Sequence, residues 1–109
     1  MHELGITRNI VAIVSERAGS ARVKRVAVEI GELSAVMPDA IRFCFDVCSR
    51  NTPLEGAELE IRAIPGRGRC SQCGETLALR LPFTRCACGS ALIECIAGNE
   101  LKIKEMETF

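Results

Sequence analysis

Apolar residues recur with helical spacing in two segments of the chain. In residues 4–18 they form an approximate stripe that stops at Gly19, a residue that favours helix termination. The second segment opens at Pro38 and Asp39, where proline tolerates the first helical position and an acid complements the helix dipole. The pattern predicts two helices, the second ending near residues 51–53. Their apolar positions are Leu4, Ile10, Val11, Ile13, Val14 and Ala18 in the first, and Ile41, Cys44, Phe45 and Cys48 in the second.

Three shorter segments alternate apolar and polar residues, which is typical of half-buried strands. They are residues 25–30 before Gly31, residues 58–63 before Pro65, and residues 101–104 near the C-terminus. Between the last two, residues 66–90 hold four Gly and four Cys and show weak periodicity. We therefore expect an α+β fold. Residues 1–65 with 99–109 would form a small three-stranded sheet with two helices, and residues 66–98 an inserted module held together by a ligand.

Composition narrows the classes of function. The chain has 109 residues, enough for one small domain with an appended module, and 48% of them are hydrophobic. Lys+Arg and Asp+Glu are 14 each, and this zero net charge argues against a nucleic-acid partner. The longest apolar run, residues 10–14, is too short to span a membrane. Charged residues interrupt the N-terminus, so we expect no signal peptide and a reducing, cytoplasmic setting for the seven cysteines.

Four of these cysteines form two close pairs. Cys70 and Cys73 are separated from Cys86 and Cys88 by twelve residues, and a glycine follows each pair directly. This spacing is typical of a zinc-ribbon-like module in which four thiolates complete a tetrahedron around a structural zinc. Bound metal would supply folding free energy to a segment that is poor in apolar residues. The alternatives are four free cysteines, partly buried, or a redox pair at Cys70 and Cys73, although no βαβ pattern surrounds it.

The other three cysteines have simpler interpretations. Cys44 and Cys48 lie one helical turn apart and share a face with Ile41 and Phe45, so a place in the core is favoured over a second metal pair. Cys95 is expected in the core beside a strand, with a reserve role as a zinc ligand as the alternative.

The N-terminus carries the only histidine, His2, between Met1 and Glu3. An imidazole beside two backbone amides and an α-amine can chelate a metal that accepts square-planar nitrogen ligands, such as Ni²⁺ or Cu²⁺. The expected ligands are the His2 imidazole and the ionised amides of His2 and Glu3, completed by the Met1 amine or an added group. The Glu3 carboxylate would be an axial or outer group. The alternative is a frayed, solvated histidine and an ordinary acid in the first turn.

Several segments together resemble the HypA/HybF hydrogenase maturation factors, nearly end to end. They are Met1-His2-Glu3-Leu4, the segment VAVEIGELS from Val26, Phe43-Cys44-Phe45-Asp46, Cys88-Gly89-Ser90 and Glu100-Leu101-Lys102-Ile103. The resemblance implies a nickel metallochaperone with Ni²⁺ as cargo and a structural zinc. It further implies work with a HypB-type GTPase to load the large subunit of [NiFe]-hydrogenase, and support of urease in some bacteria. The family's nickel site would map to Met1, His2 and Glu3, and its zinc ligands to Cys70, Cys73, Cys86 and Cys88.

One position departs from this family. Its second cysteine pair usually has two intervening residues, whereas here Ala87 stands alone between Cys86 and Cys88. The shorter spacer predicts an altered turn, with strained or weaker zinc binding or recruitment of Cys95. No catalytic set is evident, since the chain has no second histidine, nucleophile motif or phosphate loop, and we expect no enzyme activity. The rival functions are a zinc-ribbon adaptor that binds protein partners without nickel transfer and a thiol redox sensor.

Overall fold

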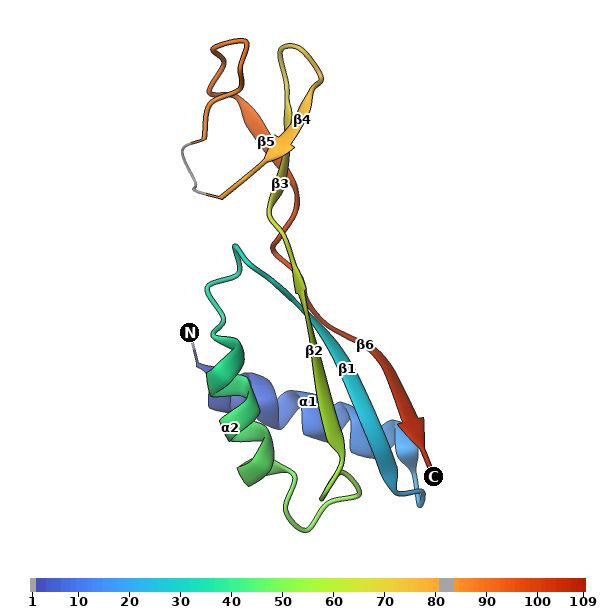
Figure 1. The fold of residues 1–109 in the computed structure, drawn as a ribbon. Coiled ribbons are helices and arrows are strands. Elements are labelled where there is room, and N and C mark those ends of the chain that lie inside the picture. The colour runs from blue at the N-terminus through green and yellow to red at the C-terminus, as the bar shows by residue number, and fades with distance from the viewer. Residues whose placement is uncertain (1, 81–83) are drawn as a thin grey trace.

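The computed structural model describes residues 2–80 and 84–109 and shows an elongated molecule measuring 54 × 22 × 17 Å (Figure 1). Two helices and a three-stranded sheet form its larger end. A second, smaller three-stranded sheet forms the opposite end. The expected α+β architecture with two helices, a three-stranded sheet and a ribbon-like module is confirmed.

Both predicted helices are present. Helix α1 (Glu3–Ala18) ends at Gly19, which takes a φ of 62° that favours glycine, and its N–H donates to the Ser15 carbonyl. Helix α2 (Pro38–Cys48) begins at the predicted proline but ends three residues before the predicted region, where a turn follows. The predicted stripe of α1 is only partly right. Leu4 and Ile13 are 43% and 46% exposed, whereas the polar Thr7 is buried, its hydroxyl donating to the Glu3 carbonyl at 2.7 Å.

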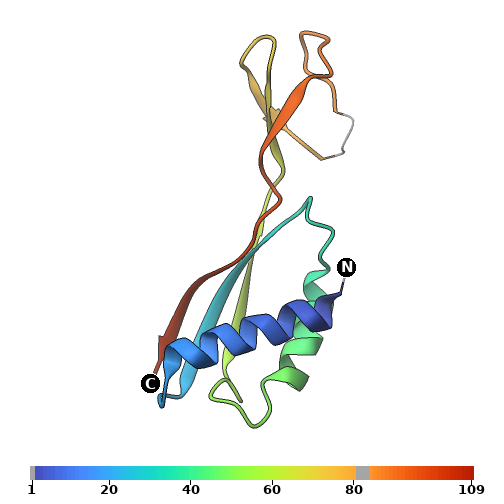
Figure 2. The same ribbon diagram turned by 180° about the vertical axis from the view of Figure 1, so that it is seen from behind.

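The larger sheet has the order β2-β1-β6, with β1 (Val23–Gly31) in the centre. Strand β2 (Glu58–Ile64) runs parallel to β1, because α2 lies in the crossover between them, and β6 (Leu101–Thr108) runs antiparallel. Helix α1 lies across one face of the sheet (Figure 2). There Val26, Val28 and Ile30 pack with buried residues of both helices into one core, to which Ile41 and Phe45 of α2 belong.

The opposite face of this sheet is charged. Arg25 of β1 forms ion pairs with Glu60, Glu105 and Glu107 at 3.4, 3.5 and 3.4 Å. Arg62 of β2 bonds to Glu60 and Glu105 at 2.6 and 2.7 Å. Since antiparallel and mixed sheets of this size commonly keep one solvated face, these pairs explain the polar half of the alternation seen in the sequence.

Strand β6 is longer than its predicted segment of residues 101–104, because a bulge interrupts the alternation of the following residues. Ala27 of β1 pairs with Glu105, but the next residue, Val28, pairs with Ile103. Lys104 is therefore an extra residue on β6. The bulge moves the apolar position from 105 to Met106, and the strict alternation in the sequence is lost at that point.

The smaller sheet was not predicted as strands. It has the order β4-β3-β5, with β3 (Arg67–Cys70), β4 (Thr76–Ala78) and β5 (Ile93–Ala97) all antiparallel. These strands are short and largely exposed, and one contains glycine, so they carry no clear hydrophobic period. None of their residues belongs to the main core cluster among the residues described.

The two ends join at a narrow crossing of the backbone, which we call the waist. It contains three glycines, Gly31, Gly66 and Gly98. A Cβ on Gly31 would lie 1.9 Å from the Gly98 carbonyl oxygen, and one on Gly66 would lie 2.0 Å from the Leu79 carbonyl oxygen. Leu33 packs against this crossing, and its N–H donates to the Gly98 carbonyl at 2.8 Å. Within residues 2–80 and 84–109, no helix combines the length and apolar character needed to cross a membrane.

Candidate metal sites

The four paired cysteines meet at the far end of the smaller sheet. The Cys70 and Cys88 sulfurs are 3.6 Å apart and those of Cys73 and Cys86 3.5 Å, and all four sulfurs lie within 4.8 Å of one another. A tetrahedron with metal–sulfur bonds of about 2.3 Å places its sulfurs roughly 3.8 Å apart. The sulfur positions therefore fit a four-coordinate metal ion.

Each pair is carried by a tight turn closed by backbone hydrogen bonds. In the first, the N–H of Cys70 donates to the Glu75 carbonyl and the N–H of Gly74 donates back to the Cys70 carbonyl, both at 2.9 Å. Gly74 has a φ of 79°, a conformation in which a Cβ is unfavourable. The turn follows directly from β3, so the sheet fixes Cys70, which is buried, while Cys73 is exposed.

The second turn is the first one shortened by a residue. The N–H of Cys86 donates to the Ser90 carbonyl at 3.0 Å, and the N–H of Gly89 donates to the Cys86 carbonyl at 2.9 Å. The inner bond thus spans three residues instead of four, which gives a β-turn closed at Gly89 with a φ of 93°. The single spacer Ala87 changes the turn, as expected, but Cys88 still reaches the other sulfurs.

The surroundings favour a thiolate at Cys70. Backbone N–H groups of Cys73 and Gln72 lower the pKa of the Cys70 thiol to about 6, despite its burial. At Cys73 the backbone amide of Glu75 acts to lower the pKa, but the bond to the Cys86 sulfur and burial outweigh it and raise the pKa to about 12. A divalent ion would replace the protons that these sulfurs share and would neutralise the accumulated charge.

The remaining cysteines stand apart from this quartet. Cys95 lies on β5, exposed; its thiol donates to the Ala97 carbonyl at 3.3 Å and its sulfur accepts a bond from Asn99. Its expected place in the core is wrong, because among the described residues the smaller sheet contributes nothing to the main core and leaves the Cys95 side chain exposed. Cys48 packs against the main core, as expected, and both it and Cys44 are partly buried. Neither joins a metal-binding group among the described residues.

The N-terminal candidates lie at the start of α1, far along the chain from the quartet. Met1 is outside the described residues. His2 is exposed and precedes the first helical residue, and its carbonyl accepts the N–H of Ile6 at 3.1 Å. The structure does not bring His2 and Glu3 together with a third ligating side chain within the described part of the chain.

Glu3 makes a contact that the sequence reasoning missed. Its Oε2 accepts a hydrogen bond from the backbone N–H of Met37 at 3.2 Å, and this bond lowers the pKa of the Glu3 carboxyl. Met37 is the N-cap residue of α2 and has no side-chain acceptor of its own. No local signal in the sequence marks this bond, because the donor is the backbone N–H of the N-cap residue itself and the acceptor lies on the other helix.

A family model, relatives in sequence and solved structures all match this chain over nearly its whole length. The family model described as hydrogenase/urease nickel incorporation metallochaperone, HypA, matches residues 1–108. A protein of Nostoc sp. named hydrogenase maturation factor HypA is 63% identical over 107 residues, which cover 98% of this chain and 95% of the relative. The protein of the same name from Geobacter metallireducens is 49% identical over 108 residues, 98% of each chain.

Solved structures give the same result. The solution structure of a HypA protein superposes with a TM-score of 0.75 at 25% identity and covers 100% of this chain and 97% of that one. The solution structure of the Ni metallochaperone HypA from Helicobacter pylori, at 24% identity, has the same fold with a TM-score of 0.68 and covers 99% of this chain and 97% of that one. This chain therefore belongs to the HypA family of hydrogenase and urease nickel-incorporation metallochaperones.

Proposed function

We propose that this protein binds Ni²⁺ through Met1, His2 and Glu3 and delivers it for [NiFe]-hydrogenase maturation, with urease as a further recipient. Family membership over residues 1–108 is the observation that carries this proposal. The protein would act as a carrier and catalyse no reaction of its own. A HypB-type GTPase would supply the nucleotide chemistry, and the hydrogenase large subunit would receive the ion.

The start of α1 suits a nickel chelate. The first N–H groups of a helix have no acceptor within the helix, so ionising the amides of His2 and Glu3 costs no helical hydrogen bond. The two negative charges would also offset the unfavourable encounter of a dication with the positive end of the helix dipole. Because His2 is exposed, a partner's ligands can approach the metal and exchange with it.

The Glu3 carboxylate would orient this chelate instead of holding the metal directly. Its bond to Met37 ties the beginning of α1 to the beginning of α2. The backbone nitrogen of Glu3 remains available for nickel, and the side chain limits how far the first turn can move. Groups that fix a metal ligand's orientation commonly matter for affinity nearly as much as the ligands.

We further propose that the cysteine quartet holds zinc with a structural role. Zinc prefers four thiolates in a tetrahedron, and a site with four protein ligands leaves no open position for substrate. The smaller sheet has few buried apolar side chains, Leu79 being the main one within its described residues, so the metal would replace a hydrophobic core. Residues 66–98 would then be a unit whose folding depends on zinc.

Nickel titration of untagged protein with its native N-terminus tests the nickel proposal. Wild type should bind one equivalent, and His2→Ala should lose it while keeping its zinc and its circular dichroism spectrum. Asn9→Ala, an exposed change on the same helix, is the control and should bind nickel as the wild type does. If His2→Ala took up one equivalent as tightly as the wild type, the carrier function would be wrong and a zinc-containing adaptor would remain.

Delivery needs a second assay. Nickel-loaded protein, a HypB-type GTPase and an immature hydrogenase large subunit would be mixed, and nickel in the re-isolated large subunit measured. Transfer should require His2, and replacement of His2 should not weaken zinc binding. Nickel uptake by the large subunit at the same rate from the His2→Ala protein would contradict a role in delivery.

A further inference from the structure

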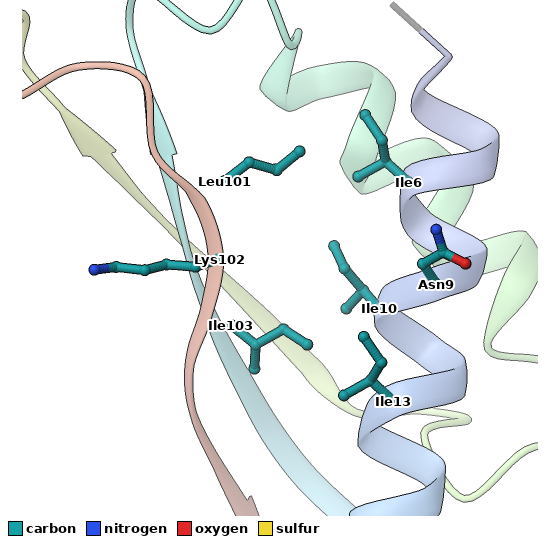
Figure 3. Close-up of a pocket in the computed structure, with 7 residues that line it drawn as sticks. All are labelled: Ile6, Asn9, Ile10, Ile13, Leu101, Lys102 and Ile103. Atoms are coloured by element: carbon teal, nitrogen blue, oxygen red, sulfur yellow. The ribbon is translucent and has the colours of Figure 1, made fainter.

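An apolar groove runs between α1 and β6. Two adjoining cavities of about 280 and 220 Å³ form it, and Ile13 of α1 and Ile103 of β6 line both of them. Figure 3 shows the first cavity, where Leu101 and Ile103 point toward the isoleucines of α1, while Lys102 points away. Leu101 and Ile13 are 39% and 46% exposed, so apolar surface in the groove remains in contact with water.

The strand that forms one wall of this groove is also a free edge. Strand β6 pairs with β1 on one side, and its outer side pairs with no other strand among the described residues. An edge strand presents unpaired backbone N–H and C=O groups to an incoming chain. A groove between such an edge and a helix therefore suits an extended peptide. The peptide backbone bonds to the edge strand, and alternate side chains enter the groove.

One end of the groove is basic. Arg17 and Lys104 line the second cavity, and neither takes part in an ion pair within the part of the chain that the structure describes. Glu105 lines this cavity too, but its carboxylate is already held by Arg62 and Arg25 at 2.7 and 3.5 Å. Because opposite charges on the rim of an interface attract each other, this end of the groove favours an acidic residue in the bound chain.

We propose that this groove binds an extended peptide segment of a partner protein as a strand antiparallel to β6. Alternate apolar side chains of the segment enter the cavities beside Ile10, Ile13 and Ile103, and acidic residues at its N-terminal end lie against Arg17 and Lys104. The antiparallel direction gives the more stable pairing per residue. It also puts the N-terminal end of the segment beside the second half of β6, where the two cations lie.

Fluorescence anisotropy of a synthetic peptide, titrated with the zinc-loaded full chain, tests the proposal. The probe has two glutamates followed by alternating valine and threonine, with the fluorophore at its C-terminus. Wild type should bind it saturably, and Ile13→Gln should weaken binding by about tenfold, because a polar amide replaces apolar surface in the groove. Val47→Gln is the matched control, since Val47 is 45% exposed on α2 and lines neither cavity.

A charge exchange tests the basic end of the groove. Arg17→Glu should weaken binding of this probe by about fivefold at low salt, because an attraction is replaced by a repulsion. The same variant should bind more tightly a second probe in which lysines replace the glutamates. Arg50→Glu changes the net charge equally at an exposed position that lines neither cavity, and it should leave both affinities unchanged.

Hydrogen exchange locates the bound probe. Saturating probe should protect residues 101–108 and not β2, the other edge of the larger sheet. No saturable binding, equal effects of Ile13→Gln and Val47→Gln, or protection confined to other segments would overturn the proposal. Protection of residues 101–108 that grows with protein concentration and does not respond to the probe would assign the groove to a second copy of the chain, and it would also overturn the proposal.

Discussion

Gly31→Ala should destabilise the protein strongly, because it adds one methyl group at the waist between the two sheets. The new Cβ would lie 1.9 Å from the oxygen and 2.1 Å from the carbon of the Gly98 carbonyl, and 2.6 Å from the Asn99 nitrogen. All three are backbone atoms, so no side chain can move aside. The β6 connection would have to shift away from β1.

That shift would disturb two short hydrogen bonds, from Gly31 N–H to the Glu100 carbonyl at 2.7 Å and from Leu33 N–H to the Gly98 carbonyl at 2.8 Å. Each contributes about 1 kcal/mol, and steric overpacking typically costs about 1–3 kcal/mol. Together these contributions give an expected loss of about 3–5 kcal/mol in the free energy of unfolding. Domains of this kind have only about 5–15 kcal/mol in total.

Urea unfolding of zinc-saturated protein, followed by far-ultraviolet circular dichroism, measures this loss. Gly5→Ala provides a control with the opposite sign. Gly5 lies in α1 with no atom within 4 Å of an added Cβ, so alanine should stabilise the helix by up to about 1 kcal/mol. If Gly31→Ala unfolded at the wild-type urea concentration, the waist would be looser than its backbone contacts imply and the steric argument would be wrong.

Three further outcomes are expected. Cys88→Ser should lose its zinc on dialysis against a mild chelator while keeping its helical circular dichroism signal, whereas Cys95→Ser should keep one equivalent of zinc. Elemental analysis measures the zinc, and equal retention by the two variants would show that the four ligands are misassigned. Glu3→Ala should speed hydrogen exchange at the Met37 amide, the N-cap of α2, read by NMR, while Glu3→Gln keeps an acceptor there and should change it little. Hydrogen bonds from Arg62 and Arg25 hold the pKa of the Glu105 carboxyl below its usual 4.5. The ionised carboxylate therefore stabilises the folded protein fully above pH 4.5, and this contribution is lost as the pH falls through the lowered pKa. The thermal midpoint of wild type should therefore fall more than that of Glu105→Gln between about pH 5 and 3, and parallel curves would contradict this assignment.

The metal site shows what spacing can and cannot reveal. Two close cysteine pairs followed by glycines predicted the quartet, and the sulfurs do converge. The consequence of Ala87 needed the structure, because the closing bond from Gly89 spans one residue less than the bond from Gly74. Cys95 was misjudged because its place beside a strand was taken as a place in the core, whereas its burial depends on what lies over β5. No local pattern carries that information.

The contact between Glu3 and Met37 illustrates the same limit at the N-terminus. The sequence marked Glu3 as an acid in the first turn of a helix, where it complements the dipole. Its hydrogen bond goes instead to the beginning of the other helix, 34 residues away in the chain. Only the packing of α1 against α2 brings the carboxylate and the amide together.

The sequence by itself determined the local elements, because helix and strand periods and Gly and Pro signals act between near neighbours. It therefore specified a helix over residues 4–18, a helix from Pro38, a strand ending at Gly31 and the pairing of cysteines into two turns. The tertiary structure decided the strand order β2-β1-β6, the bulge at Lys104 and the glycine waist. These depend on contacts between residues far apart in the chain, and their free energies arise only when the separate elements meet.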